Sequence, residues 1–130
     1  MQLCIDTVKL RVDKRCTNQQ LYSMDTQDRR RYEHRAAMFK ALAHPMRLLM
    51  LERLRLRPWC VCELAAEVGI EKSVASKHLS QLREAGLIED ERRGTLVEYR
   101  LVAPCVLDMA DCAERTVLAR AKKRIGVSEA

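Results

Sequence analysis

The pattern of hydrophobic positions is helical over residues 29–56. Residues 29–43 predict an amphipathic helix. Its apolar stripe consists of Tyr32, Ala36, Phe39 and Ala43. A second helix is predicted to begin at Pro45, because the first position of a helix needs no backbone N–H, and to end before Pro58. Residues 46–56 are apolar on almost every side, so we expect this second helix to be buried.

Two more helices, joined by a tight turn, are predicted between residues 59 and 86. The first is expected to end at Gly69 and the second at Gly86, because glycine closes a helix in the left-handed conformation without steric cost. Ser73 is expected to cap the second helix, since its hydroxyl can accept a backbone N–H left free at the helix start. The pattern therefore indicates a pair of short helices with defined ends.

The second of these helices has two contrasting faces. Its apolar stripe contains Ala75, Leu79, Leu82 and Gly86. Its opposite face contains Ser73, Ser76, Lys77 and Ser80. Small residues let the backbone approach DNA closely, while serine and lysine reach phosphates and base edges, so this helix is typical of the recognition helix of a helix-turn-helix. A two-helix corner with a solvated polar face is the alternative.

Alternating positions after residue 86 predict a β-hairpin. Residues 87–93 and 96–101 form its strands, and Gly94 begins the turn. The inward positions of the second strand are Val97, Tyr99 and Leu101. Arg92 and Arg93 lie at the tip of the hairpin. A hairpin that carries arginines directly after a recognition helix is a wing, which we expect to lie along the phosphate backbone.

A last helix is predicted to open at Pro104 and to reach about residue 123. Its apolar face contains Cys105, Val106, Met109, Ala110, Cys112, Ala113 and Val117. Because this face is too wide for one neighbour in so small a domain, we expect it and the helix at 29–43 to pair with the same helices of a second chain. The resulting two-fold homodimer would match the half-site symmetry of an operator.

The predicted fold is mainly α with a β-hairpin wing, in the order α-α-α-α-β-β-α. Residues 28–123 form the winged helix-turn-helix and dimerisation domain, preceded by an arm at 1–27 and followed by a tail at 124–130. Among the 130 residues, 24 Lys and Arg against 18 Asp and Glu give a net charge of +6, consistent with double-stranded DNA as partner. Because a run of about 18 apolar residues and a signal-peptide core are both absent, we expect a cytoplasmic protein with no membrane partner.

Six cysteines are the main chemical feature of the sequence. Structural disulfides are not expected in a reducing compartment, which leaves metal ligands, redox thiols or small buried hydrophobic residues. Cys60 and Cys62 stand two apart at the start of a predicted helix, where their side chains would project about 200° apart. Both can bind one ion only if the first turn unwinds, so ion binding is predicted to deform the helix that supports the recognition helix.

Two thiolates make an incomplete site for the soft ions Cd(II), Pb(II), As(III) and Sb(III), which take more than two sulfur ligands. Cys4 and Cys16, in the arm, are available as further ligands. Cys105 and Cys112 are a second candidate pair, on one face of the last helix but about 10 Å apart along its axis. Each of these two would need a partner from elsewhere, and the alternative is that both are small apolar residues in the dimer interface.

An enzyme is disfavoured by the same inventory of residues. No glycine-rich phosphate loop is present, and no cysteine has a histidine and a carboxylate suggestively arranged for nucleophilic catalysis. No organic cofactor is expected.

Three segments carry a resemblance to a known family. They are residues 39–48 (FKALAHPMRL), 60–65 (CVCELA) and 76–88 (SKHLSQLREAGLI). In this order, with the predicted wing and last helix, about residues 32–112 resemble the ArsR/SmtB family of metal-responsive repressors. The resemblance implies a dimeric winged helix-turn-helix that occupies its operator when metal-free and leaves it when a thiophilic ion binds. The DNA contacts that it implies are Lys72, Ser73, Ser76, Lys77 and His78, with Arg92 and Arg93 from the wing.

The resemblance also bears on the inducing ion. Arsenic sensors of the family often take a third sulfur from position 65, which is Ala65 here, whereas its cadmium and lead sensors recruit N-terminal cysteines such as Cys4 and Cys16. Its zinc-type site uses an Asp-x-His start and later histidines, but Asp108 is followed by Met109 and Ala110, which disfavours a zinc, cobalt or nickel sensor. The alternative function is a repressor of the same fold that senses oxidants or reactive sulfur through a cysteine pair.

Overall fold

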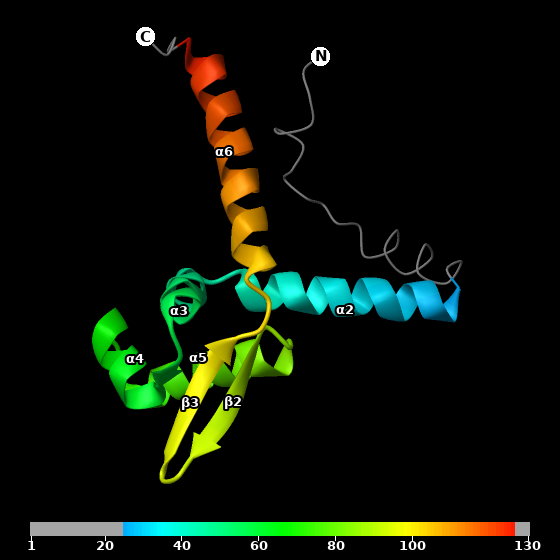
Figure 1. The fold of residues 1–130 in the computed structure, drawn as a ribbon. Coiled ribbons are helices and arrows are strands. Elements are labelled where there is room, and N and C mark those ends of the chain that lie inside the picture. Colours follow the sequence, from blue (N-terminus) through cyan, green and yellow to red (C-terminus); the bar gives the residue numbers. More distant parts are fainter. Residues whose placement is uncertain (1–24, 127–130) are drawn as a thin grey trace. The chain divides into compact units, whose positions relative to one another are not determined.

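The computed structural model describes residues 25–126 (Figure 1). The described residues fall into two units, 25–37 and 38–126. Helix α2 (Thr26–Leu42) confirms the first predicted helix and begins slightly earlier than expected. Its residues in the first unit are exposed and include an ion pair at 3.0 Å between Arg29 and Glu33, one turn apart.

The hydrophobic core lies in the second unit. It is built from α3 (Pro45–Leu56), α4 (Val61–Val68) and α5 (Lys72–Glu84), together with the ends of neighbouring elements. Its largest fully buried side chains are Met50, Leu51, Leu64, Leu79, Leu82, Leu87 and Leu107. Each such side chain contributes roughly 1.5–3 kcal/mol by leaving water, so these contacts hold α5 in place against α3 and α4.

Helix α3 begins where the proline signal predicts. Pro45 occupies its first turn, and the imidazole Nδ1 of His44 accepts the backbone N–H of Met46 at 3.1 Å, which caps the helix. The expected burial is confirmed for the side of the helix that carries Met50, Leu51 and Leu54. It is wrong for the C-terminal end, where Leu56 is 74% exposed, because the neighbouring elements cover one side of α3 only.

The helix-turn-helix is formed by α4 and α5. Gly69 ends α4 with φ 75°, as predicted, and the next residue, Ile70, packs against the core. Gly86 has φ 77° and follows the end of α5, so the second predicted stop is also confirmed. The expected Ser73 cap is wrong: the Ala75 N–H donates to the Glu71 carbonyl at 3.0 Å, which places Ser73 inside the first turn of the helix.

The predicted hairpin is confirmed as β2 (Ile88–Arg93) and β3 (Leu96–Leu101), joined at the paired residues Arg93 and Leu96 by the turn Gly94-Thr95. Gly94 has φ 65°, a conformation that hairpin turns of this length require. On β3, Tyr99 and Leu101 pack against the core, so the hairpin is anchored at its base and projects its tip (Figure 1).

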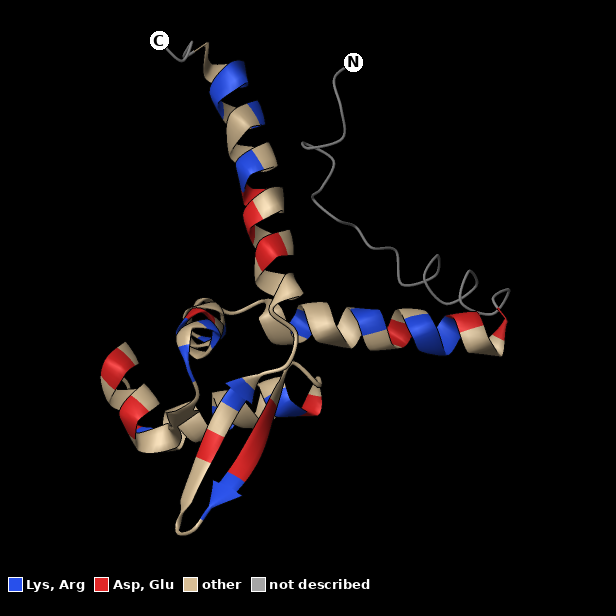
Figure 2. Ribbon diagram, in the orientation of Figure 1, with Lys and Arg blue, Asp and Glu red and all other residues tan. Residues whose placement is uncertain are grey.

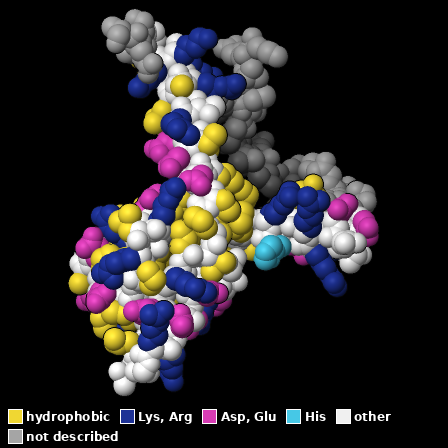
Figure 3. All heavy atoms as spheres, viewed as in Figure 1, with side chains coloured by type: hydrophobic (Ala, Val, Ile, Leu, Met, Phe, Trp, Pro, Cys, Tyr) yellow, Lys and Arg dark blue, Asp and Glu magenta, His cyan; other side chains and the backbone are white. Residues whose placement is uncertain are grey.

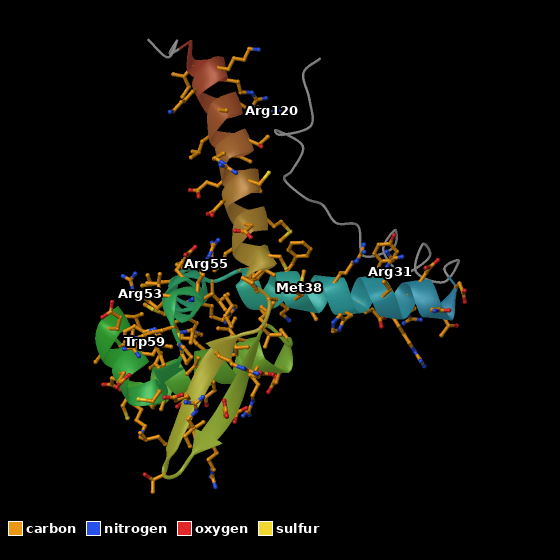
Figure 4. All side chains as sticks on the ribbon, in the orientation of Figure 1. Arg31, Met38, Arg53, Arg55, Trp59 and Arg120 are labelled. Atoms are coloured by element: carbon orange, nitrogen blue, oxygen red, sulfur yellow. The ribbon has the colours of Figure 1, made fainter. Side chains whose placement is uncertain are left out.

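A third strand was not expected from the sequence. Trp59 and Cys60 form β1, which pairs antiparallel with β3 opposite Tyr99 and Glu98, so the strand order is β1-β3-β2. The indole N–H of Trp59 donates to the Arg53 carbonyl at 2.9 Å, which holds the strand beside α3 (Figure 4). The prediction that Cys60 stands at the start of a helix is confirmed, since Cys60 is the N-cap residue of α4, and its backbone also pairs with β3 of the wing.

Helix α6 (Cys105–Ile125) follows Pro104 and confirms the last predicted helix. Its first turn is buried through Val106 and Leu107, and Arg55 of α3 pairs with Asp108 at 2.6 Å. Farther along, the helix is exposed (Figure 1). Among the helices of residues 25–126, none combines the length and apolar character that a membrane span needs.

Candidate DNA interface and thiol sites

The outer face of α5 is open along the length of the helix. Its inner stripe, Ala75, Leu79 and Leu82, has no exposed surface. Away from this stripe, the exposed positions include Ser73, Lys77, Ser80 and Gln81, while Ser76 is half-buried. Lys72 is exposed in the first turn of the helix, on the same side as the stripe. A helix that is held by its apolar side and presents hydroxyl, amide and ammonium groups can donate hydrogen bonds to phosphates and base edges.

Two further exposed residues of α5 were not among the predicted contacts. Val74 is 39% exposed, and Gln81 is exposed one turn beyond Lys77. Their helical spacing from the buried stripe was the available signal, because it places both on the outer half of the helix.

His78 lies at the edge of this face. Its ring centroid is 4.6 Å from that of His44, the capping residue of α3, and its side chain is half-buried. Burial, followed by the nearby His44 and the positive charge of Arg47, lowers the pKa of His78 below the ordinary value of 6.5. The ring is therefore held uncharged near neutral pH, and it contributes packing at this edge more readily than positive charge.

Arg47 connects three helices of the second unit. Its Nε donates to the Ala41 carbonyl at 2.5 Å and its Nη2 to the Lys40 carbonyl at 3.2 Å, both in the last turn of α2. Its Nη1 donates to the side-chain oxygen of Gln81 in α5. A positive charge in the first turn of a helix is unfavourable, because it lies at the positive end of the helix dipole. The position of Arg47 there was the signal in the sequence that this side chain needs acceptors from other elements.

The wing has a basic tip on an acidic strand. Figure 2 shows acidic residues along β2 and basic residues at its end. Glu89 pairs with Arg100, and Asp90 pairs with Arg83 at 3.3 Å. At the tip, Arg93 lies 3.5 Å from carboxylate oxygens of both Glu91 and Glu98.

The second arginine at the tip, Arg92, is exposed and makes no ion pair with any residue in the described range. Arg92 can therefore contact a phosphate without first breaking an ion pair with another described residue.

The described cysteines are free thiols in two places. Cys60 is half-buried on β1 and Cys62 is exposed on α4, while Cys105 and Cys112 are exposed on α6. Within residues 25–126, no cluster of three or more His, Cys, Asp or Glu residues is arranged to hold a metal. The remaining predicted ligands, Cys4 and Cys16, lie outside the described residues.

The backbone conformation at Cys60 changes the argument about ion binding. Cys60 is extended, with φ −79° and ψ 159°, and α4 begins only at Val61. The two thiols are therefore not constrained to opposite sides of one helix. The predicted unwinding assumed that both residues lie in one regular helix, a premise that the extended backbone of Cys60 does not meet, and deformation of α4 by a bound ion stays a prediction.

An apolar hollow of about 320 Å³ lies where α2, α3 and α6 meet in the second unit. It is lined by Phe39, Leu42, Ala43, Leu48, Met109, Ala110 and Ala113. Hydrophobic side chains gather at the surface here (Figure 3), and Phe39 and Met109 are 51% and 40% exposed. Exposed apolar side chains gathered in this way are typical of interaction sites.

Comparison with known proteins gives concordant results. Residues 44–90 match the pattern of the bacterial regulatory protein, arsR family. The HTH-type transcriptional regulator Rv0081 of Mycobacterium tuberculosis, itself uncharacterised, is 40% identical over 100 residues, which are 75% of this chain and 87% of that protein.

Two solved structures are also similar. The solution structure of a homodimeric winged helix-turn-helix DNA-binding domain, Mb0332 from Mycobacterium bovis, has a TM-score of 0.66 at 25% identity and covers 78% of this chain and 94% of its own. The antimony-specific transcriptional repressor AntR has a TM-score of 0.59 at 30% identity, covering 77% of this chain and 91% of its own.

Proposed function

The chain belongs to the arsR family of bacterial regulatory proteins and is a DNA-binding transcriptional regulator rather than an enzyme, and we propose that it is a repressor released from its operator by a thiophilic ion. The candidate inducers are Cd(II), Pb(II), As(III) and Sb(III), bound through cysteine thiolates. The observation that carries this proposal is that Cys60 belongs to the sheet of the wing while Cys62 belongs to the helix behind α5.

DNA binding is proposed through the outer face of α5 and the tip of the wing. The proposed contacts on α5 are Lys72, Ser73, Ser76, Lys77 and His78. Arg92 and Arg93 are the proposed contacts of the wing. The exposure of Lys77 and Arg92 supports these roles, and the net charge of +6 favours a polyanionic partner.

A homodimer is proposed through the apolar hollow. Phe39 and Met109 leave large apolar surfaces in water in a single chain, which a second copy of α2 and α6 would cover. The homodimeric state of the similar domain from Mycobacterium bovis supports this arrangement. Two copies of α5 would then meet the two half-sites of one operator.

The two elements that carry the thiols suggest how ion binding weakens DNA binding. Cys60 is hydrogen-bonded through the backbone to β3 of the wing, and Cys62 lies on α4, which packs against α5. An ion bound by both sulfurs draws β1 and α4 together and so changes the position of the wing relative to α5. The coupling is reciprocal, so DNA weakens ion binding by the same factor.

The third sulfur ligand is proposed to come from Cys4 or Cys16, with Cys105 and Cys112 as the second candidate pair. Both residues of the second pair are exposed on α6 and so are accessible to an ion. The similar structure of AntR, an antimony-specific repressor, supports a soft metalloid as the inducer of this chain.

The test compares two double variants on DNA that the wild-type protein enriches from a random duplex library. The variant Cys60→Ser with Cys62→Ser should bind this DNA normally but stay bound when Sb(III), As(III), Cd(II) or Pb(II) is added, because the ion has lost its first two ligands. Fluorescence anisotropy reports release, and charge-transfer absorbance reports ion–sulfur bonds. The matched control is Cys105→Ser with Cys112→Ser.

If an ion released the Cys60→Ser, Cys62→Ser variant from DNA as it releases the wild type, Cys60 and Cys62 would not be ligands of the inducing ion. Release by an oxidant or a persulfide, with no charge-transfer absorbance for any of the four ions, would favour the thiol-redox alternative instead. Because Cys62 is exposed, a small oxidant can reach its thiol.

A further inference from the structure

Arg47 determines which end of the Gln81 amide points outward. A guanidinium has only N–H donors, so the group that it contacts on Gln81 must be the side-chain oxygen. The same guanidinium also donates to the backbone carbonyls of Lys40 and Ala41 at the end of α2. With three acceptors fixing its plane, Arg47 keeps the oxygen of Gln81 turned toward α3 and leaves the amide NH2 group to face away.

No residue between 25 and 126 accepts a hydrogen bond from the NH2 group of Gln81, whose side chain lies on the proposed DNA face. Gln81 is exposed and stands four residues after Lys77 on the same side of α5. We propose that Gln81 contacts DNA as a donor-only group whose orientation is set by Arg47. This inference rests on the proposed use of α5 for DNA binding.

The locked orientation limits what Gln81 can recognise. A free glutamine pairs with adenine through two bonds, one accepted by its oxygen and one donated by its nitrogen. With its oxygen turned toward Arg47, Gln81 presents its two N–H donors to the DNA, so it selects acceptors. These are a phosphate oxygen or a base acceptor, of which guanine offers two, O6 and N7, and adenine N7 and thymine O4 offer one each. The hydrogen bond from a cation also polarises the amide, which makes its N–H groups stronger donors.

The test uses two substitutions of Gln81 and DNA that the wild-type full chain enriches from a random duplex library. Gln81→Leu removes the donors and should weaken binding about tenfold. Gln81→Glu keeps an oxygen for Arg47 but presents a second, anionic oxygen to the DNA, so binding should fall by at least about another tenfold. Ala66→Glu adds the same charge on an exposed position of α4 and should change affinity by less than about twofold.

The role of Arg47 is tested by a double-mutant cycle. In an Arg47→Met background the amide can rotate, so Gln81→Leu should weaken binding by a smaller factor than in the wild type. Arg47→Met alone should leave the salt dependence of binding unchanged, because the guanidinium donates to three acceptors within the chain and is not proposed to contact a phosphate. Arg47→Lys, which keeps the charge but cannot reach all three acceptors, gives a second background if the methionine variant does not fold.

Three results overturn the inference. They are equal binding by Gln81→Glu and Gln81→Leu, wild-type binding by either variant, and an equal effect of Gln81→Leu in the presence and absence of Arg47. If the wild-type chain enriches no duplex at all, the proposed function fails with it. If it enriches DNA and the variants behave in one of the three ways, only the role of Gln81 and Arg47 is refuted. The enriched sequences then distinguish a base acceptor from a phosphate acceptor, because selection of a base appears in the enriched sequence and a phosphate contact does not.

Discussion

Replacing Lys77 by alanine tests the DNA interface most directly. Lys77 lies in the middle of the exposed face of α5, on the side opposite Leu79 and the rest of the buried stripe. It forms no ion pair with any residue between 25 and 126, so its removal exposes no buried charge and leaves the core intact. A change in DNA binding would therefore reflect the loss of a contact with DNA.

The expected size of the change follows from counterion release. Each phosphate that a lysine neutralises contributes a slope of about −0.9 to the plot of log affinity against log salt. The proposed homodimer carries Lys77 twice, so Lys77→Ala should make the slope less negative by about 1.8. Between about 50 and 200 mM salt, a slope difference of about 1.8 lowers the ratio of wild-type to variant DNA affinity by roughly twelvefold.

The assay is a salt series of fluorescence anisotropy titrations on one enriched duplex. Lys123→Ala, which removes an exposed lysine from the end of α6, is the matched control and should leave the slope unchanged. An unchanged slope for Lys77→Ala would refute the phosphate contact, whatever the change in affinity. A slope change of about 0.9 would mean that one Lys77 side chain contacts phosphate in each complex, against the two-fold arrangement.

Three further predictions concern stability and assembly. Gly69→Ala should lower the free energy of unfolding by about 1 kcal/mol, because φ is 75° and an added methyl group meets nothing within 4 Å; urea titration should show a smaller loss for Gly69→Asn, and equal losses would contradict this account. Because the pKa of His78 is lowered in the folded chain, the unfolded chain binds that proton more readily, so stability should fall as the pH drops from 6.5 toward the lowered pKa. Urea titrations across this range should show a weaker pH dependence for His78→Gln, and an identical dependence would exclude His78 as its source. Phe39→Glu places a charge in the apolar hollow and should convert dimer to monomer in sedimentation experiments, whereas the equally exposed but distant Leu96→Glu should not; a dimeric Phe39→Glu variant would move the interface elsewhere.

Local signals in the sequence were sufficient for most of the elements. Pro45 begins α3, Gly69 ends α4, and Gly94 makes the turn of the wing, each because the residue's own backbone preference decides the conformation at that point. The apolar spacing of α5 likewise identified the face that the core buries and therefore the face left for DNA. These effects act within one or two turns of the chain, so a sequence reveals them without its tertiary partners.

Tertiary structure decided the features on which the proposed mechanism depends. Cys60 is on a strand because the wing, at Glu98, offers its backbone a partner that lies far along the chain. Gln81 is oriented by Arg47, which is 34 residues away in the sequence. Neither residue type carries a local preference for these arrangements, and the partners meet only after the core has brought α3, α5 and the wing together. The sequence alone therefore determined which residues face outward, whereas the packed chain determined which of their atoms are free to bind.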